Sequence, residues 1–118
     1  MHFEIAADDL DGLTDFYTRV LRWTVNPGPQ GFDDYRIIET SDNKDSIGGG
    51  LFKKKSPDQG VIMYFRVDHM ERATDTVLES GGQVVDPKTA IKGIGWYSVC
   101  SDPEGNMFGL WVHDADAE

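Results

Sequence analysis

The sequence has one cysteine, Cys100, and few basic residues. It contains 11 lysines and arginines but 21 aspartates and glutamates, which gives a formal net charge of −10. A single cysteine excludes an internal disulfide and is typical of a buried apolar side chain in a reducing compartment. The acidic balance argues against nucleic acid and anionic membranes as partners. No apolar run has the length of a secretory leader or a membrane span. We therefore expect a cytoplasmic protein.

The chain does contain an internal repeat. When residues 1–52 are placed on residues 61–112 without gaps, eight positions are identical, more than the roughly three expected from ordinary composition. Among them are Asp8/Asp68, Pro27/Pro87 and Gly49/Gly109. Two copies of this length favour a pair of small supersecondary modules rather than a solenoid.

The hydrophobic pattern is the same in both copies. Apolar residues alternate in a first strand, recur at helical spacing in a following helix, and alternate again in three short strands. In the first copy we predict strands at 1–7, 23–25, 35–40 and 47–52 and a helix over 10–21. In the second we predict strands at 61–67, 83–85, 96–101 and 107–113 and a helix over 70–80.

Local signals mark where the elements begin and end. Acidic residues precede both helices, so we expect Asp8 or Asp9 and then Asp68 to act as N-caps, and Gly81 to end the second helix in a left-handed conformation. The loops at 26–34 and 86–95 are rich in glycine and proline, so their paths stay open. We expect the lysine run at 53–55 to be a solvated strand end and the tail, 114–118, to be frayed.

Three segments resemble one known family. They are His2-Phe3-Glu4-Ile5 followed by Phe16-Tyr17, the Ser80-Gly81-Gly82 end of the second helix, and Asp102-Pro103-Glu104-Gly105-Asn106 before the last strand. In this order they resemble the vicinal oxygen chelate superfamily, which includes glyoxalase I, extradiol dioxygenases and bleomycin resistance proteins. The resemblance is nearest to its short glyoxalase-like proteins and covers almost the whole chain.

The resemblance implies an α+β fold. Two βαβββ modules, repeats 1–53 and 61–113 of a single domain 1–118, would form curved mixed sheets around a cleft, with the helices on the convex side. It also implies a homodimer that binds a small organic ligand.

Strand alternation predicts which side chains face that cleft. Counting residues along each strand gives His2 and Glu4 on the first strand, and Tyr64 and Arg66 on the fifth. On the last strand it gives Met107 and Trp111, and by repeat symmetry it gives Ile47, Gly49 and Leu51 on the fourth. A few polar side chains among aromatic ones are typical of a site that binds a small ligand. The alternative is a closed core in which Glu4 pairs with Arg66, because buried charges need partners.

Metal-dependent relatives hold a divalent ion on the first and last strand of each module. Carried over, those positions are His2, Gly49, Ile62 and Gly109, of which only His2 can donate. Catalytic metal sites use about three protein ligands, and Glu4 lies ~6.7 Å along the strand from His2. We therefore predict no metal and no cofactor. The alternative is a variant site that uses His2 and Glu39.

Two kinds of function follow. The first is a metal-independent small-molecule-binding protein that uses His2, Glu4, Tyr64, Arg66, Met107 and Trp111. The alternative is a metal-dependent lyase, isomerase or dioxygenase of the lactoylglutathione lyase kind that uses His2. A narrower third reading is sequestration of a cationic antibiotic. No nucleophile motif or phosphate-binding loop is present, so the sequence supports neither nucleophilic catalysis nor phosphate binding. Whether the protein is an enzyme stays open between the first two hypotheses.

Overall fold

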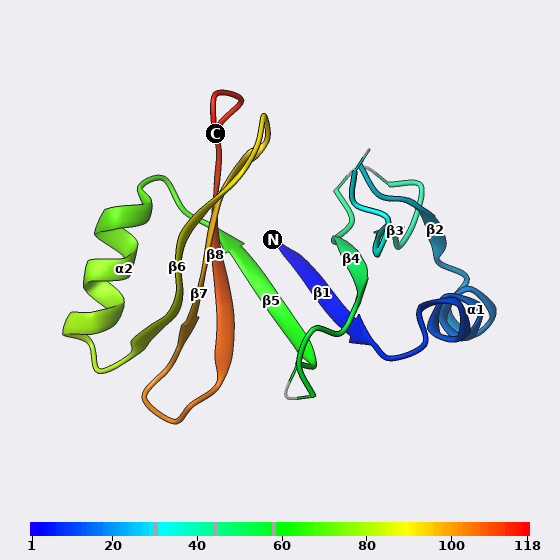
Figure 1. Cartoon of the computed structure of the whole chain (residues 1–118), viewed down its shortest axis with the longest axis horizontal. Coiled ribbons are helices and arrows are strands. Elements are labelled where there is room, and N and C mark those ends of the chain that lie inside the picture. The colour runs from blue at the N-terminus through cyan, green and yellow to red at the C-terminus, as the bar shows by residue number, and fades with distance from the viewer. Residues whose placement is uncertain (30, 44, 58) are drawn as a thin grey trace. The chain divides into compact units, whose positions relative to one another are not determined.

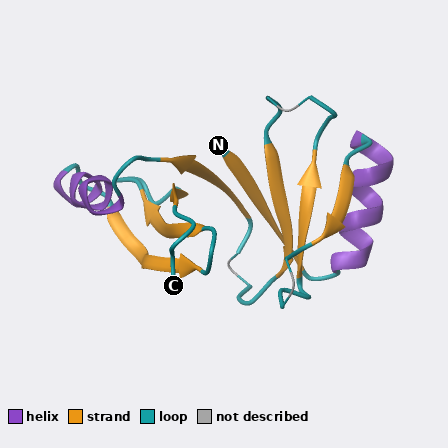
Figure 2. Cartoon of the chain, turned by 90° about the horizontal axis from the view of Figure 1, so that it is seen from above, coloured by secondary structure: helices purple, strands orange, loops and turns teal. Residues whose placement is uncertain are grey.

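The computed structural model describes residues 1–29, 31–43, 45–57 and 59–118, so Gln30, Lys44 and Asp58, which fall in predicted loops, lie outside the described residues. The chain divides into two compact units, Met1–Ile62 and Met63–Glu118. Figure 1 labels their elements, and Figure 2 colours them by type. We call the two units, with the strand β5 assigned to the second, the first and second module. No helix among the described residues is long and apolar enough to cross a membrane.

The first module follows the order strand, helix and three strands. Its elements are β1 (His2–Ala7), α1 (Leu10–Leu21), β2 (Thr24–Pro27), β3 (Tyr35–Glu39) and β4 (Gly48–Lys53). The strands lie in the order β2-β3-β4-β1, and β1 runs parallel to β4 while the other pairs are antiparallel.

The second module repeats this order. Its elements are β5 (Val61–Arg66), α2 (Met70–Glu79), β6 (Gln83–Ile91), β7 (Gly95–Ser101) and β8 (Met107–His113). The strands lie in the order β5-β8-β7-β6, with β5 parallel to β8. The predicted α+β class and its two βαβββ modules with mixed sheets are therefore confirmed.

Each helix packs on one face of its own sheet. In the first module Ile5, Ile38 and Leu51 form a buried cluster against which Leu13 and Tyr17 of α1 pack. In the second, Met70 of α2 joins Cys100 and Leu110, and Ala73 and Val77 pack against them. We call this side of each sheet the helix-covered face and the opposite side the helix-free face.

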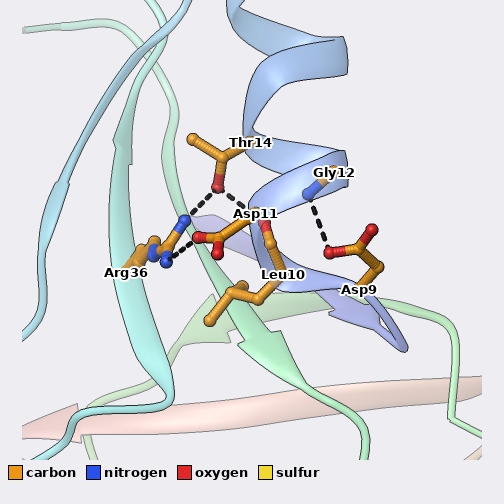
Figure 3. A network of polar contacts seen from close by, with 6 residues as sticks. All are labelled: Asp9, Leu10, Asp11, Gly12, Thr14 and Arg36. Atoms are coloured by element: carbon orange, nitrogen blue, oxygen red, sulfur yellow. Dashed lines mark hydrogen bonds and ion pairs between the residues drawn. The ribbon is translucent and has the colours of Figure 1, made fainter.

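The start of α1 is fixed by the side chains of Asp9 and Arg36 (Figure 3). The Asp9 carboxylate accepts a hydrogen bond from the Gly12 N–H at 3.0 Å, which satisfies one free donor of the first turn. The Arg36 guanidinium, on β3, donates to Thr14 Oγ1 at 2.6 Å and to Asp11 Oδ1 at 2.5 Å. Asp9 is thus the cap, one of the two residues that the sequence indicated.

The start of α2 differs from the prediction. Its N-cap is His69 rather than Asp68, and the His69 side chain makes no capping hydrogen bond. The C-terminal prediction is confirmed: Gly81 has a φ of 95°, and the Gly82 N–H donates to the Val77 carbonyl at 2.9 Å.

Two predictions at the far end of the second module are wrong. The predicted strand at 83–85 continues to Ile91, because β6 pairs with β7 through two register shifts, so most of the expected loop at 86–95 is strand. The expected frayed tail is also part of the fold. Ala117 is only 1% exposed and its carbonyl accepts the Gly93 N–H at 2.9 Å, while Asp114 accepts a hydrogen bond from the Trp96 indole at 3.0 Å.

Candidate ligand-binding faces

Strand register identifies the side chains of the helix-free face in the first module. Glu4 pairs with Gly50 and His2 with Gly48, whereas Phe3 pairs with Gly49 and Ile5 with Leu51. Because paired residues share a face, the glycines beside His2 and Glu4 are Gly48 and Gly50. The prediction that Gly49 and Leu51 face the cleft is therefore wrong: Gly49 pairs with Phe3, and Leu51 is fully buried beneath α1. Ile47, the third residue of that prediction, precedes β4.

The error has a simple cause in the length of the repeats. Glu4 pairs with Gly50, whereas its counterpart Tyr64 pairs with Gly109. The first module is thus one residue longer between its first and last strands than an ungapped alignment allows. A one-residue shift moves every side chain of a strand to the opposite face.

Glu4, Tyr35 and His2 lie together on this face of the first module. The Tyr35 hydroxyl donates to Glu4 Oε2 at 2.8 Å, and His2 Nε2 lies 3.9 Å from the same oxygen. The Glu4 side chain is 18% exposed and that of His2 41%. Partial burial lowers the pKa of His2, although Glu4 acts in the opposite direction. The imidazole is therefore neutral near pH 7, with one nitrogen able to donate and the other to accept.

A glycine makes this approach possible. The Tyr35 phenol lies over Gly50, where a Cβ atom would collide with the hydroxyl and ring. The lack of a side chain at Gly50 thus lets β3 reach across β4 to β1.

The second module has the same arrangement with aromatic side chains. The Tyr64 ring lies over Gly109 at a distance that a Cβ atom would not permit, and Tyr64 is 7% exposed. Tyr97, which stands on β7 where Tyr35 stands on β3, meets the Tyr64 ring edge-on at a centroid distance of 6.5 Å. The two tyrosines therefore form an edge-to-face pair across a glycine.

Arg66 and Trp111 extend this face. They pair across β5 and β8, and Trp111 also pairs with Tyr97 of β7. Arg66 is exposed and belongs to no salt bridge among the residues described, so its guanidinium is available to a ligand. Met107 is on the same face but pairs with Ser101 at the opposite end of β8, and it is 43% exposed.

Sequence reasoning missed Tyr35, Gly50 and Tyr97. The same parity rule, applied to β3 and β7, could have found the two tyrosines. Gly50 could be placed on this face only from the register of β1 and β4.

These faces do not fit a divalent metal ion. Within the described part of the chain, no three His, Cys, Asp or Glu side chains lie close enough to hold one. Gly50 and Gly109 offer no side-chain donor atoms, and a tyrosine ring covers each. Glu39 accepts a hydrogen bond from Asn26 Nδ2 at 3.3 Å and is on β3, two strands from His2 and about 10 Å away.

Cys100 is fully buried, as expected for a small apolar side chain. Burial raises the pKa of its thiol, so the thiolate needed for nucleophilic attack is disfavoured.

Comparison with known proteins agrees with this fold. The "Putative glyoxylase CFP32" of Mycobacterium tuberculosis is 27% identical over 114 residues, which cover 92% of this chain. They cover 43% of that protein, so the chain spans less than half the length of this curated relative.

Solved structures show the same fold at low identity. A glyoxalase/bleomycin resistance protein/dioxygenase superfamily member from Vibrio splendidus 12B01 superposes with a TM-score of 0.66 at 16% identity, over 94% of this chain and 96% of that chain. The Mn(II)-bound glyoxalase from Novosphingobium aromaticivorans gives a TM-score of 0.67 at 14% identity, over 98% of this chain and 38% of that chain. The family model described as the glyoxalase-like domain matches residues 2–111. The chain is therefore a member of the glyoxalase-like domain family, within the superfamily that the sequence motifs indicated.

Proposed function

We propose that this protein binds a small organic ligand on its helix-free faces without a metal ion. In the first module the ligand-binding residues are His2 and Glu4, and in the second they are Tyr64, Arg66, Met107 and Trp111. The observation that carries the proposal is the pair of glycines, Gly50 and Gly109, each covered by a tyrosine ring where a metal-binding carboxylate would need space.

The second module supports a planar, anionic ligand. Trp111 and Tyr97 provide aromatic surface beside the Arg66 guanidinium. Aromatic rings stack on flat apolar groups, and a guanidinium binds a carboxylate through two parallel hydrogen bonds. A planar aromatic carboxylate meets both requirements.

The first module supports a polar contact. The Glu4 carboxylate keeps lone pairs beyond the one used by Tyr35, and neutral His2 lies next to it. Together they accept hydrogen bonds from hydroxyl or amino groups of a ligand.

Titration with 2-naphthoate tests the aromatic face. We expect saturable quenching of tryptophan fluorescence, and about tenfold weaker binding in Arg66→Gln, because a charge-assisted hydrogen bond contributes about 1.5 kcal/mol. Trp111→Phe should weaken binding less and remove most of the quenching. Arg19→Gln, a change at an exposed arginine of α1, is the matched control and should bind as the wild type does.

Metal analysis tests the other half of the proposal. Protein purified without chelator should contain no stoichiometric zinc, nickel, iron or manganese. A stoichiometric metal that His2→Ala removes would instead support the lyase, isomerase or dioxygenase alternative.

We also propose that residues 1–118 act as one domain in a cytoplasmic homodimer. Exposed apolar side chains on α1, Phe16 at 53% and Val20 at 59%, support a subunit interface. Light scattering should give twice the chain mass of 13.2 kDa. A monomer at micromolar concentration would contradict the homodimer and leave the ligand proposal standing.

A further inference from the structure

The second module has a groove on its helix-covered side, away from the residues of its helix-free face. It has a volume of about 560 Å³ and lies between α2 and the turn that joins β7 to β8. Apolar side chains, Ala73, Val77, Phe108 and Pro103 among them, line it together with Arg72 and His69. Its volume is in the range of sites that bind small molecules.

The internal repeat explains why this groove is larger in the second module than in the first. The α2 residues Ala73 and Val77 stand where α1 has Leu13 and Tyr17. In the first module Tyr17 stacks on Trp23 at a centroid distance of 5.1 Å and fills the corresponding space. The position of Trp23 is Gln83 in the second module, so the filling aromatic pair is absent there.

The hollow that remains at the same place in the first module is smaller, about 340 Å³. Its lysine, Lys54, is 3.7 Å from the Asp8 carboxylate. The cationic side chain of that hollow therefore already has a carboxylate partner, Asp8.

The polar groups around the second-module groove favour an anion. Arg72 is exposed and forms no salt bridge among the described residues, and the His69 side chain makes no capping hydrogen bond. The Asp102 carboxylate is occupied: it accepts the N–H groups of Glu104 and Asn106 and the Asn106 side-chain amide, each at 2.9 Å. Asp68 remains as an exposed acceptor at the rim. Arg72 is thus a cationic group of this lining that has no salt-bridge partner among the described residues.

We propose that this groove binds a small amphipathic anion, with its apolar body along Ala73, Val77 and Phe108 and its carboxylate or phosphate on Arg72. The guanidinium supplies two parallel donors to the carboxylate or phosphate. The small side chains of α2, Ala73 and Val77, leave room for the apolar body of the ligand. The groove is a second site, independent of the helix-free faces.

Octanoate is the probe that tests the proposal, followed by the amide chemical shifts of ¹⁵N-labelled protein. We expect saturable shifts centred on Arg72, Ala73 and Val77. The variant Ala73→Leu/Val77→Tyr, which gives α2 the side chains of α1, should abolish them. Arg72→Gln should weaken binding about tenfold, whereas Arg19→Gln and Trp111→Phe should leave it unchanged. Octylamine, with the same tail and the opposite charge, should bind at least about tenfold more weakly.

Three results would overturn the proposal. They are no octanoate shifts at these amides, unchanged octanoate binding in Arg72→Gln, or octylamine binding as tight as octanoate. Arg72 is exposed, so its variant folds even if the filled-groove variant does not, and the amide spectrum reports folding in both.

Discussion

In the first module Tyr35 reaches across Gly50 to the carboxylate of Glu4, whereas in the second Tyr97 meets the ring of Tyr64 across Gly109. The backbone arrangement is the same, and the chemistry placed on it is polar in one module and aromatic in the other. On the helix-covered side the contrast is reversed. There the first module is filled by Tyr17 and Trp23, and the second keeps a groove. A duplicated fold can therefore divide binding and packing differently between its copies.

The largest effect should come from the two cores. Leu51 and Leu110 occupy equivalent positions and are 0% and 6% exposed. Leu51→Ala should lower the free energy of unfolding by about 4 kcal/mol and Leu110→Ala by about 2–3 kcal/mol, within the range for cavity-forming changes. The second module should lose less because Leu110 is less completely enclosed. Urea denaturation measures both, and equal losses would remove this distinction between the modules.

The next effect compares the tyrosines. Tyr35→Phe removes the donor to Glu4 and leaves a largely buried carboxylate without that hydrogen bond, so the free energy of unfolding should fall by about 1–2 kcal/mol. Tyr97→Phe keeps its ring contact with Tyr64 and should change stability by less than about 0.5 kcal/mol. Thermal unfolding of both variants would test this prediction. A larger loss of stability in Tyr97→Phe than in Tyr35→Phe would contradict it.

The helix caps give a smaller contrast. Asp9→Ala removes the capping hydrogen bond of α1 and should cost about 1 kcal/mol. His69→Ala should cost almost nothing, because the imidazole does not cap α2, and His69→Ser should stabilise the second module by up to about 1 kcal/mol. Chemical denaturation of the three variants separates these outcomes. A destabilising His69→Ser would mean that the first turn of α2 is satisfied in another way.

The smallest effect depends on pH. Hydrogen bonds from Asn106, with those from the Glu104 and Gly105 backbones, lower the pKa of Asp102. The folded state thus favours the ionised form, and its stabilising effect is present above the unfolded-state pKa and lost as pH falls through the lower folded-state pKa. Asp102→Asn should therefore be less stable than the wild type at pH 7, and the difference should close in acid. Urea denaturation at pH 7 and in acid measures both proteins, and an equal stability difference at the two pH values would contradict the prediction.

The fold was predictable because each signal was local or periodic. Alternation and helical spacing indicated all eight strands and both helices, and the glycine at position 81 marked the end of α2. Parity predicted which side chains share a helix-free face only where it stayed within one strand, as for His2 and Glu4 or for Tyr64 and Arg66. It failed on β4, because one extra residue between distant strands changes the register and leaves no local trace. The groove was also beyond prediction, since an empty volume depends on three-dimensional packing that a single sequence does not reveal.

The buried alanine near the C-terminus has a practical consequence. The residues after β8 turn back so that the Ala117 carbonyl holds the Gly93 amide and Asp114 holds the Trp96 indole. These few residues hold the turn of the β6–β7 hairpin in place. Protease cleavage after His113 would release the turn of this hairpin. A label attached to the buried Ala117 would displace the tail from it. Position 118, which is exposed, is the better place for an attachment.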